Sequence, residues 1–112
     1  MSRDNEVAYI GRANTIKRTL QKQGAALTEG ERTAITRVQA RFGTWCIDTS
    51  VGPDPIEYDD SDGAVRMQIG LVPGLTVGRY DLTLTCFDAA TPEGFAWGGF
   101  RLTVVEWTVC DV

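Results

Sequence analysis

The chain has 112 residues, which is enough for one domain with its own hydrophobic core. Apolar residues make up 43% and charged residues 23%, a globular balance that excludes an intrinsically disordered chain. The net charge of −4 disfavours binding of nucleic acid through the whole domain. The sequence has no run of the roughly 20 apolar residues that a membrane-spanning helix needs, so no membrane partner is expected.

The charges are divided unevenly along the sequence. Residues 1–47 carry eight Lys/Arg and four Asp/Glu, whereas residues 48–112 carry three Lys/Arg and eleven Asp/Glu. Both sets fit an ordinary solvated surface. They also fit a dipolar subunit whose basic part meets the acidic part of a neighbour.

The N-terminal residues 1–6 are polar and lack the apolar segment of a secretory signal, so we expect a protein that stays in the cytosol. Three cysteines in that compartment are expected to be reduced thiols. Cys86 lies in an apolar run and is predicted to be a small buried residue. A Cys46–Cys86 bridge between facing sheets is the alternative.

The first predicted element is an extended strand over residues 9–20, followed by a glycine turn. Thr28 and Glu31 have the spacing of a capping box, in which each residue bonds to the backbone of the other. One or two helical turns to Ala34 should follow, too few for a helix that is stable alone.

Residues 36–42 alternate between apolar and polar side chains. Val38, Ala40 and Phe42 should face inward, and the residues between them outward. After a glycine, residues 44–47 resume the pattern, which predicts the second strand of a hairpin.

Residues 49–63 form the longest irregular stretch, with a brief strand expected at 56–58. Val65, Met67 and Ile69 then alternate with polar residues, which predicts a half-buried strand.

The clearest strand covers residues 80–86, where every second residue is apolar. A loop is expected over 88–94. Two closing strands, 95–97 and 100–105, are expected on either side of Gly98-Gly99.

Short strands separated by turns, without alternation of strands and helices, predict an all-β antiparallel sandwich of about six to eight strands with one short helix. The predicted organisation is an N-terminal arm over residues 1–13, the sandwich over 14–105 and a C-terminal tail over 106–112.

A motif at residues 75–80 carries a resemblance to a known family. It reads Leu-Thr-Val-Gly-Arg-Tyr and resembles the L-x-x-G-x-Y strand entry of immunoglobulin-like domains. Together with Asn-Thr-Ile at 14–16, Leu-Thr at 27–28 and the closing strand 100–105, the pattern resembles immunoglobulin-like modules of tailed-phage virion proteins, of the type at the N-terminus of the baseplate upper protein. The resemblance extends over residues 9–105.

The resemblance implies a non-enzymatic virion structural protein that is assembled in the host cytoplasm. It implies a tail, baseplate or fibre-attachment component that forms homo-oligomers and binds other phage structural proteins. A capsid decoration (cement) protein and a head–tail connector are the alternatives.

The sequence offers little chemistry. It contains no histidine, so triads and zinc sites that need histidine are excluded, and no catalytic, cofactor-binding or metal-binding residue is predicted. The acidic residues gather in one segment, which is expected to be a solvated loop, with an acidic docking surface or a calcium site as alternatives. They are Asp54, Glu57, Asp59, Asp60 and Asp62.

The aromatic residues suggest where partners bind. Trp45 and Tyr80 are predicted to fill the core. Aromatic residues are enriched at interfaces, and an apolar strand edge invites pairing with another chain. The predicted interface residues are Trp97, Phe100, Val105, Trp107 and Val109. A carbohydrate-binding module, with Trp97 and Trp107 as its platform, is the alternative.

Overall fold

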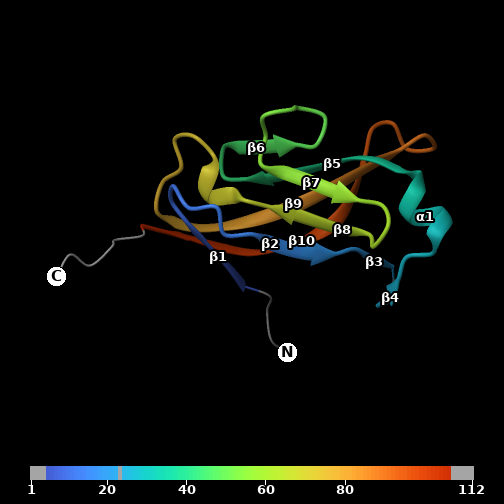
Figure 1. The fold of residues 1–112 in the computed structure, drawn as a ribbon, viewed down its shortest axis with the longest axis horizontal. Coiled ribbons are helices and arrows are strands. Elements are labelled where there is room, and N and C mark those ends of the chain that lie inside the picture. Colours follow the sequence, from blue (N-terminus) through green and yellow to red (C-terminus); the bar gives the residue numbers. More distant parts are fainter. Residues whose placement is uncertain (1–4, 23, 107–112) are drawn as a thin grey trace.

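The computed structural model describes residues 5–22 and 24–106, which form two β-sheets around a shared core (Figure 1). The larger sheet has five strands, in the order β1 (Asn5–Tyr9), β10 (Phe95–Val105), β9 (Gly78–Asp88), β5 (Ile35–Phe42) and β6 (Trp45–Asp48). The smaller sheet has the order β2 (Ile16–Thr19), β8 (Ala64–Met67) and β7 (Ile56–Asp59). The hairpin of β3 (Gln21–Lys22) and β4 (Ala25–Ala26), the helix α1 (Glu29–Ala34) and the 3-10 turn η1 (Ile69–Leu71) complete the described residues. The prediction of an all-β sandwich with one short helix is confirmed.

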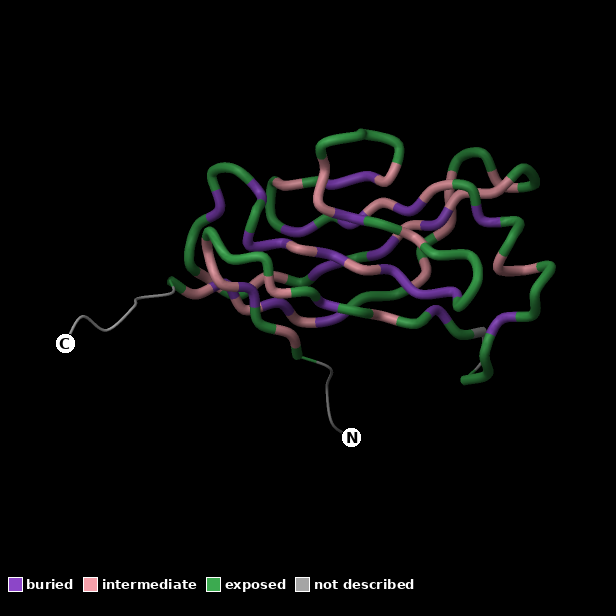
Figure 2. The backbone as a smooth tube through the Cα atoms, viewed as in Figure 1, coloured by how far each residue is buried: buried purple, intermediate pink, exposed green. Residues whose placement is uncertain are grey.

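The core is made by alternate residues of the central strands. Val38 and Ala40 on β5 are fully buried, as are Met67 on β8 and Leu102 on β10. Figure 2 shows this alternation as buried segments that recur along the middle strands of both sheets. Period-two burial is what a pleated strand produces when one face meets the core, so the predicted inward residues of β5 are confirmed.

The helix α1 begins as its sequence predicts. The Thr28 hydroxyl accepts a hydrogen bond from the Glu31 N–H at 3.3 Å, and the Glu31 carboxylate accepts one from the Thr28 N–H at 2.9 Å. This reciprocal pair satisfies two backbone donors that would otherwise lack partners at the helix start. The helix lies at one end of the sandwich, beside the start of β10 (Figure 1).

An aromatic cluster occupies the corner where β9 begins. The Trp45 ring stacks on Phe42 with centroids 5.7 Å apart, and Tyr80 meets Trp45 edge-on at 5.5 Å. The Tyr80 hydroxyl donates to the backbone carbonyl of Thr76 at 3.0 Å. Trp45 and Tyr80 are half-buried, and both contact the buried Phe42 ring at the margin of the core. They therefore contact the core residues, as predicted, but they are half-buried and do not lie inside the core.

The structure corrects the N-terminal arm that was predicted over residues 1–13. Residues 5–9 form β1, which pairs in parallel with β10 from Asn5 opposite Arg101 to Tyr9 opposite Val105. The sandwich is therefore not wholly antiparallel. Within β1 only Ala8 is buried, and one buried residue leaves no alternation that could be detected in the sequence.

Two further strand predictions need correction. The predicted strand over 9–20 is interrupted, because β1 ends at Tyr9 and β2 begins at Ile16. The two closing strands are one continuous strand, β10, with an irregularity between Ala96 and Gly98. Ala96 pairs with Thr85 and Gly98 with the adjacent Leu84, so Trp97 is the extra residue of a β-bulge.

A candidate interaction surface around Trp97

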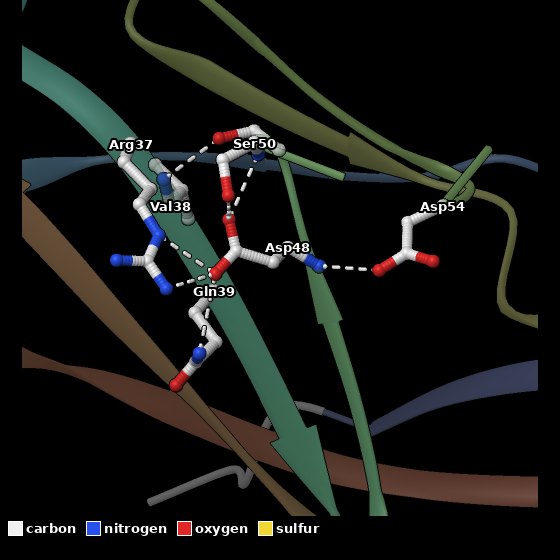
Figure 3. Close-up of polar contacts among 7 residues, drawn as sticks. Arg37, Val38, Gln39, Asp48, Ser50 and Asp54 are labelled. Atoms are coloured by element: carbon white, nitrogen blue, oxygen red, sulfur yellow. Dashed lines mark hydrogen bonds and ion pairs between the residues drawn. The ribbon is translucent and has the colours of Figure 1, made fainter. Parts of the chain in front are cut away.

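The Asp48 carboxylate on β6 accepts hydrogen bonds from three other side chains (Figure 3). Its side chain is buried, and its carboxylate accepts hydrogen bonds from Arg37 Nε at 2.7 Å and from Gln39 Nε2 at 3.2 Å. The Ser50 N–H and hydroxyl both donate to the other carboxylate oxygen at 2.8 Å. The Arg37 guanidinium holds the pKa of Asp48 well below its ordinary value. This carboxylate is fully committed to holding β5, β6 and the following turn together.

The acidic residues of the loop between β7 and β8 bond to their neighbours. Asp59 accepts hydrogen bonds from the N–H and hydroxyl of Ser61 at 2.9 and 2.6 Å, and the pKa of Asp59 is lowered by these bonds. Asp62 accepts a hydrogen bond from Arg66 at 2.8 Å, which lowers the pKa of Asp62. Within the described residues, no three His, Cys, Asp or Glu side chains are placed to hold a metal ion.

The two described cysteines are separate thiols. Cys46 is exposed on β6, and Cys86 is fully buried on β9. Burial raises the pKa of the Cys86 thiol to about 12, so it is neutral and unreactive at physiological pH. The buried state of Cys86 is confirmed, and the alternative of a Cys46–Cys86 bridge is wrong. Cys110 lies outside the described residues.

The predicted interface residues lie in different environments. Phe100 is 6% exposed, and the Arg18 guanidinium lies over its ring at 4.7 Å, so Phe100 belongs to the core and is not a free contact. Val105 is half-buried and pairs with Tyr9 of β1. Trp107 and Val109 lie outside the described residues. Among the predicted interface residues that the structure describes, Trp97 is the half-buried aromatic residue that lines two hollows.

Trp97 stands between two hollows. The larger, which we call the helix groove, has a volume of about 560 Å³ and separates α1 from the start of β10. Phe95 lies beside Trp97 there, with ring centroids 6.2 Å apart. The remaining lining comes from β3, from α1 with its flanking residues, from the end of β9 and from β10: Gln21, Leu27, Gly30, Glu31, Ala34, Ile35, Asp88 and Ala96.

The smaller hollow, of about 430 Å³, follows the seam where β2 of one sheet borders β10 of the other. We call it the seam hollow. Leu20, Leu84 and Phe100 supply its apolar lining, and Gly98 and Gly99 leave it uncovered by side chains. A Cβ at Gly99 would lie 1.9 Å from the Leu82 carbonyl oxygen, so close pairing of β10 with β9 requires glycine there.

Sequence reasoning identified Trp97 but not its setting. The pair Gly98-Gly99 was read as a break between strands, although glycine within a strand pattern also signals a bulge or a close backbone approach. That second meaning would have placed Trp97 at a bulge, where side chains are commonly redirected. Phe95 was not singled out because its position at a loop end carries no periodic signal.

No helix among the residues that the structure describes is long and apolar enough to cross a bilayer. Comparison of the chain with family models, with curated proteins and with solved structures finds no match.

Proposed function

We propose that the chain is a non-enzymatic immunoglobulin-like module that assembles with copies of itself and with other structural proteins of a phage virion. The order β2-β8-β7 facing β10-β9-β5-β6 corresponds to strands B-E-D facing G-F-C-C′ of immunoglobulin-like sandwiches. Tyr80, near the start of β9, bonds back to the Thr76 carbonyl, as in the tyrosine corner of that class. These features support the immunoglobulin-like part of the proposal.

The observation that carries the binding part is Trp97 on its bulge between two hollows. A large aromatic residue beside an unfilled, mainly apolar groove, as Trp97 is beside the helix groove, is typical of an interface centre, where tryptophan is enriched among the residues that dominate affinity. The carboxylates of Asp48 and Asp62 are engaged with arginines and serve the fold. Binding is therefore the function that the geometry favours.

The virion part rests on the resemblance of residues 9–105 to phage modules, and the number of copies per particle tests it. Quantitative mass spectrometry of purified virions should detect the chain at a few dozen copies or fewer if it belongs to the tail or baseplate. Hundreds of copies would instead indicate capsid decoration. Absence of the chain from the particles would overturn the virion assignment.

Trp97→Ala should lower incorporation into particles by about tenfold or more, because truncating a central tryptophan commonly removes most of an interface's affinity. Val77→Ala is the matched control, since Val77 is 57% exposed and lines neither hollow. Equal incorporation of the two variants would remove Trp97 from the interface.

The helix groove also favours a second candidate, carbohydrate binding. Aromatic faces beside amide and carboxylate groups suit sugars, and Trp97 and Phe95 lie there near Gln21 and Asp88. A glycan array would test this candidate. Sugar binding that disappears in Trp97→Ala would establish it, and an array without binding would remove it.

A further inference from the structure

The outer edge of β2 offers unpaired backbone groups. In the antiparallel pair with β8, Leu20 lies opposite Gly63, and the Leu20 N–H donates to the Gly63 carbonyl at 2.9 Å. Bonded and non-bonded pairs alternate in such a ladder, so Lys17 and Thr19 direct their backbone N–H and C=O groups away from β8. Among the described residues, no hydrogen bond satisfies these outward groups.

The corresponding edge of β1 is treated differently. There the Asn14 side-chain amide donates to the Val7 carbonyl at 2.9 Å and accepts from the Tyr9 N–H at 3.4 Å. One side chain thereby occupies two backbone groups of an edge strand and hinders pairing with another chain. The edge of β2 has no such cover.

The seam hollow lies directly beside this open edge. Lys17, Arg18, Thr19 and Leu20 form one wall, and Gly98 with its neighbours forms the other. An added strand would bond to Lys17 and Thr19, and its inward side chains would enter the hollow beside Arg18, whose guanidinium lies over the Phe100 ring. When a strand adds to a sheet edge, main-chain hydrogen bonds give affinity and pockets for side chains give specificity. The edge of β2 offers the hydrogen-bonding groups, and the seam hollow offers the pocket.

The segment after β10 has the chemistry to fill the site. Residues 107–112 read Trp-Thr-Val-Cys-Asp-Val, which is rich in β-branched and aromatic residues. When the segment is extended, Trp107 and Val109 share one face. Asp111 gives the segment a negative charge, and Glu106 precedes it, whereas Lys17 is exposed at the open edge and Arg18, already paired with Glu6 at 3.1 Å, lies beside it.

The segment cannot reach the seam hollow of its own molecule. Val105 lies five residues beyond Phe100 on β10, a distance of about 17 Å along the strand. Residues 106–112 would have to reverse direction, which takes about four residues and leaves about three, or roughly 10 Å of extended chain. If this segment fills the seam hollow, it therefore comes from another copy.

We propose that residues 107–112 of one copy add as a strand to the edge of β2 in a second copy, with Trp107 and Val109 in the seam hollow. This inference rests on the proposed self-assembly and names the segment that performs it. The donor segment and the acceptor edge are different surfaces, so the contact is head-to-tail and generates rings or filaments.

Native mass spectrometry and light scattering on the full chain over a range of concentrations test the proposal. The wild type should form multimers that grow with concentration, whereas a chain lacking residues 107–112 should stay monomeric. Thr19→Pro should also stay monomeric, because it removes an outward N–H without touching the ladder to β8. Thr19→Ala is the control and should assemble like the wild type.

Mixing the two defective chains gives the sharpest result. The truncated chain keeps an open edge, and the Thr19→Pro chain keeps the segment, so a mixture should form 1:1 dimers and nothing larger. If Thr19→Pro does not fold, Lys17→Glu provides the second test: it should raise the Kd of assembly by about fivefold, and Asp111→Lys in the same chain should restore it. Restored assembly in the double variant would support the proposal. If assembly is not restored, Lys17 and Asp111 do not form the proposed charge contact.

Wild-type assembly by the truncated chain, or a wild type that is monomeric at every concentration, would overturn the inference. Either result leaves the proposed virion function intact if the chain is present in purified particles, because other proteins could then occupy the seam hollow. Absence from particles together with head-to-tail assembly in solution would overturn the virion function alone.

Discussion

Trp45 and Trp97 are both half-buried, yet their surroundings differ. Trp45 is enclosed by two rings, stacked on Phe42 and met edge-on by Tyr80. Trp97 has one ring neighbour, Phe95, and a hollow on either side. Trp45 completes the packing of its own molecule, whereas Trp97 leaves room for something else. Fractional burial alone does not distinguish the two tryptophans, whereas the space around the ring makes Trp97 the candidate for binding.

The largest expected effect tests the packing beneath Trp45. Phe42→Ala should lower the free energy of unfolding by about 4 kcal/mol, because Phe42 is 1% exposed and supports both Trp45 and Tyr80. Phe95→Ala beside Trp97 should cost about 1 to 2 kcal/mol, since Phe95 is only half-buried. Denaturant unfolding of both variants measures the difference, and equal losses would contradict the contrast between the two tryptophans.

A smaller effect is expected at Asp48, which anchors the strand that carries Trp45. Asp48→Asn should lower the free energy of unfolding at neutral pH by about 2 kcal/mol, because charged hydrogen bonds to Arg37 and Gln39 are weakened or lost. Asp59→Asn is the control on an exposed carboxylate and should have a much smaller effect.

The pH dependence of Asp48→Asn follows from the lowered pKa of Asp48. The wild-type carboxylate contributes its stability above its unfolded pKa of about 4 and loses it as the pH falls towards the lower folded value. The difference between wild type and Asp48→Asn should therefore be constant from pH 7 to about pH 5 and shrink below about pH 4. A difference that does not change over this range would show that Asp48 is not ionised in the folded protein.

The smallest effect concerns the reactivity of two thiols, Cys46 beside Trp45 and Cys86 beside the part of β10 that carries Trp97. Cys46 follows Trp45 and is exposed, so iodoacetamide should alkylate it in the folded protein. Cys86 pairs in register with Phe95 and is fully buried, with a pKa raised to about 12, so it should react only after opening or unfolding. Peptide mass spectrometry in a Cys110→Ser background measures both rates. Rapid labelling of Cys86 without global unfolding would show that the Trp97 region opens locally.

Local patterns predicted the elements that depend on local forces. The alternation in β5 and the capping box of α1 were confirmed because each rests on residues within a few positions of one another. β1 was missed because its single buried residue, Ala8, is meaningful only beside β10, almost a hundred residues later in the chain. The bulge at Trp97 was missed because it is a property of the register between β9 and β10.

The candidate site likewise has features that local sequence patterns could predict and features that they could not. Trp97 could be singled out because a large aromatic residue followed by two glycines is unusual in a strand. Phe100 was wrongly placed at the interface, although it alternates in phase with the buried Leu102 and Val104, and its ring turns to the core beneath Arg18. The hollows on either side of Trp97 could not be predicted, since their walls come from α1, β2 and β9 together.

The amino-acid sequence by itself determined the all-β class, the inward faces of the central strands and the start of the helix, because alternation and capping act between near neighbours. Only the tertiary structure decided that β1 joins the sheet, that Trp97 is raised on a bulge and that the edge of β2 stays open beside a hollow. Those features depend on pairing between distant strands. A register shift of one residue is enough to reverse which side chains are buried and which are left for a partner.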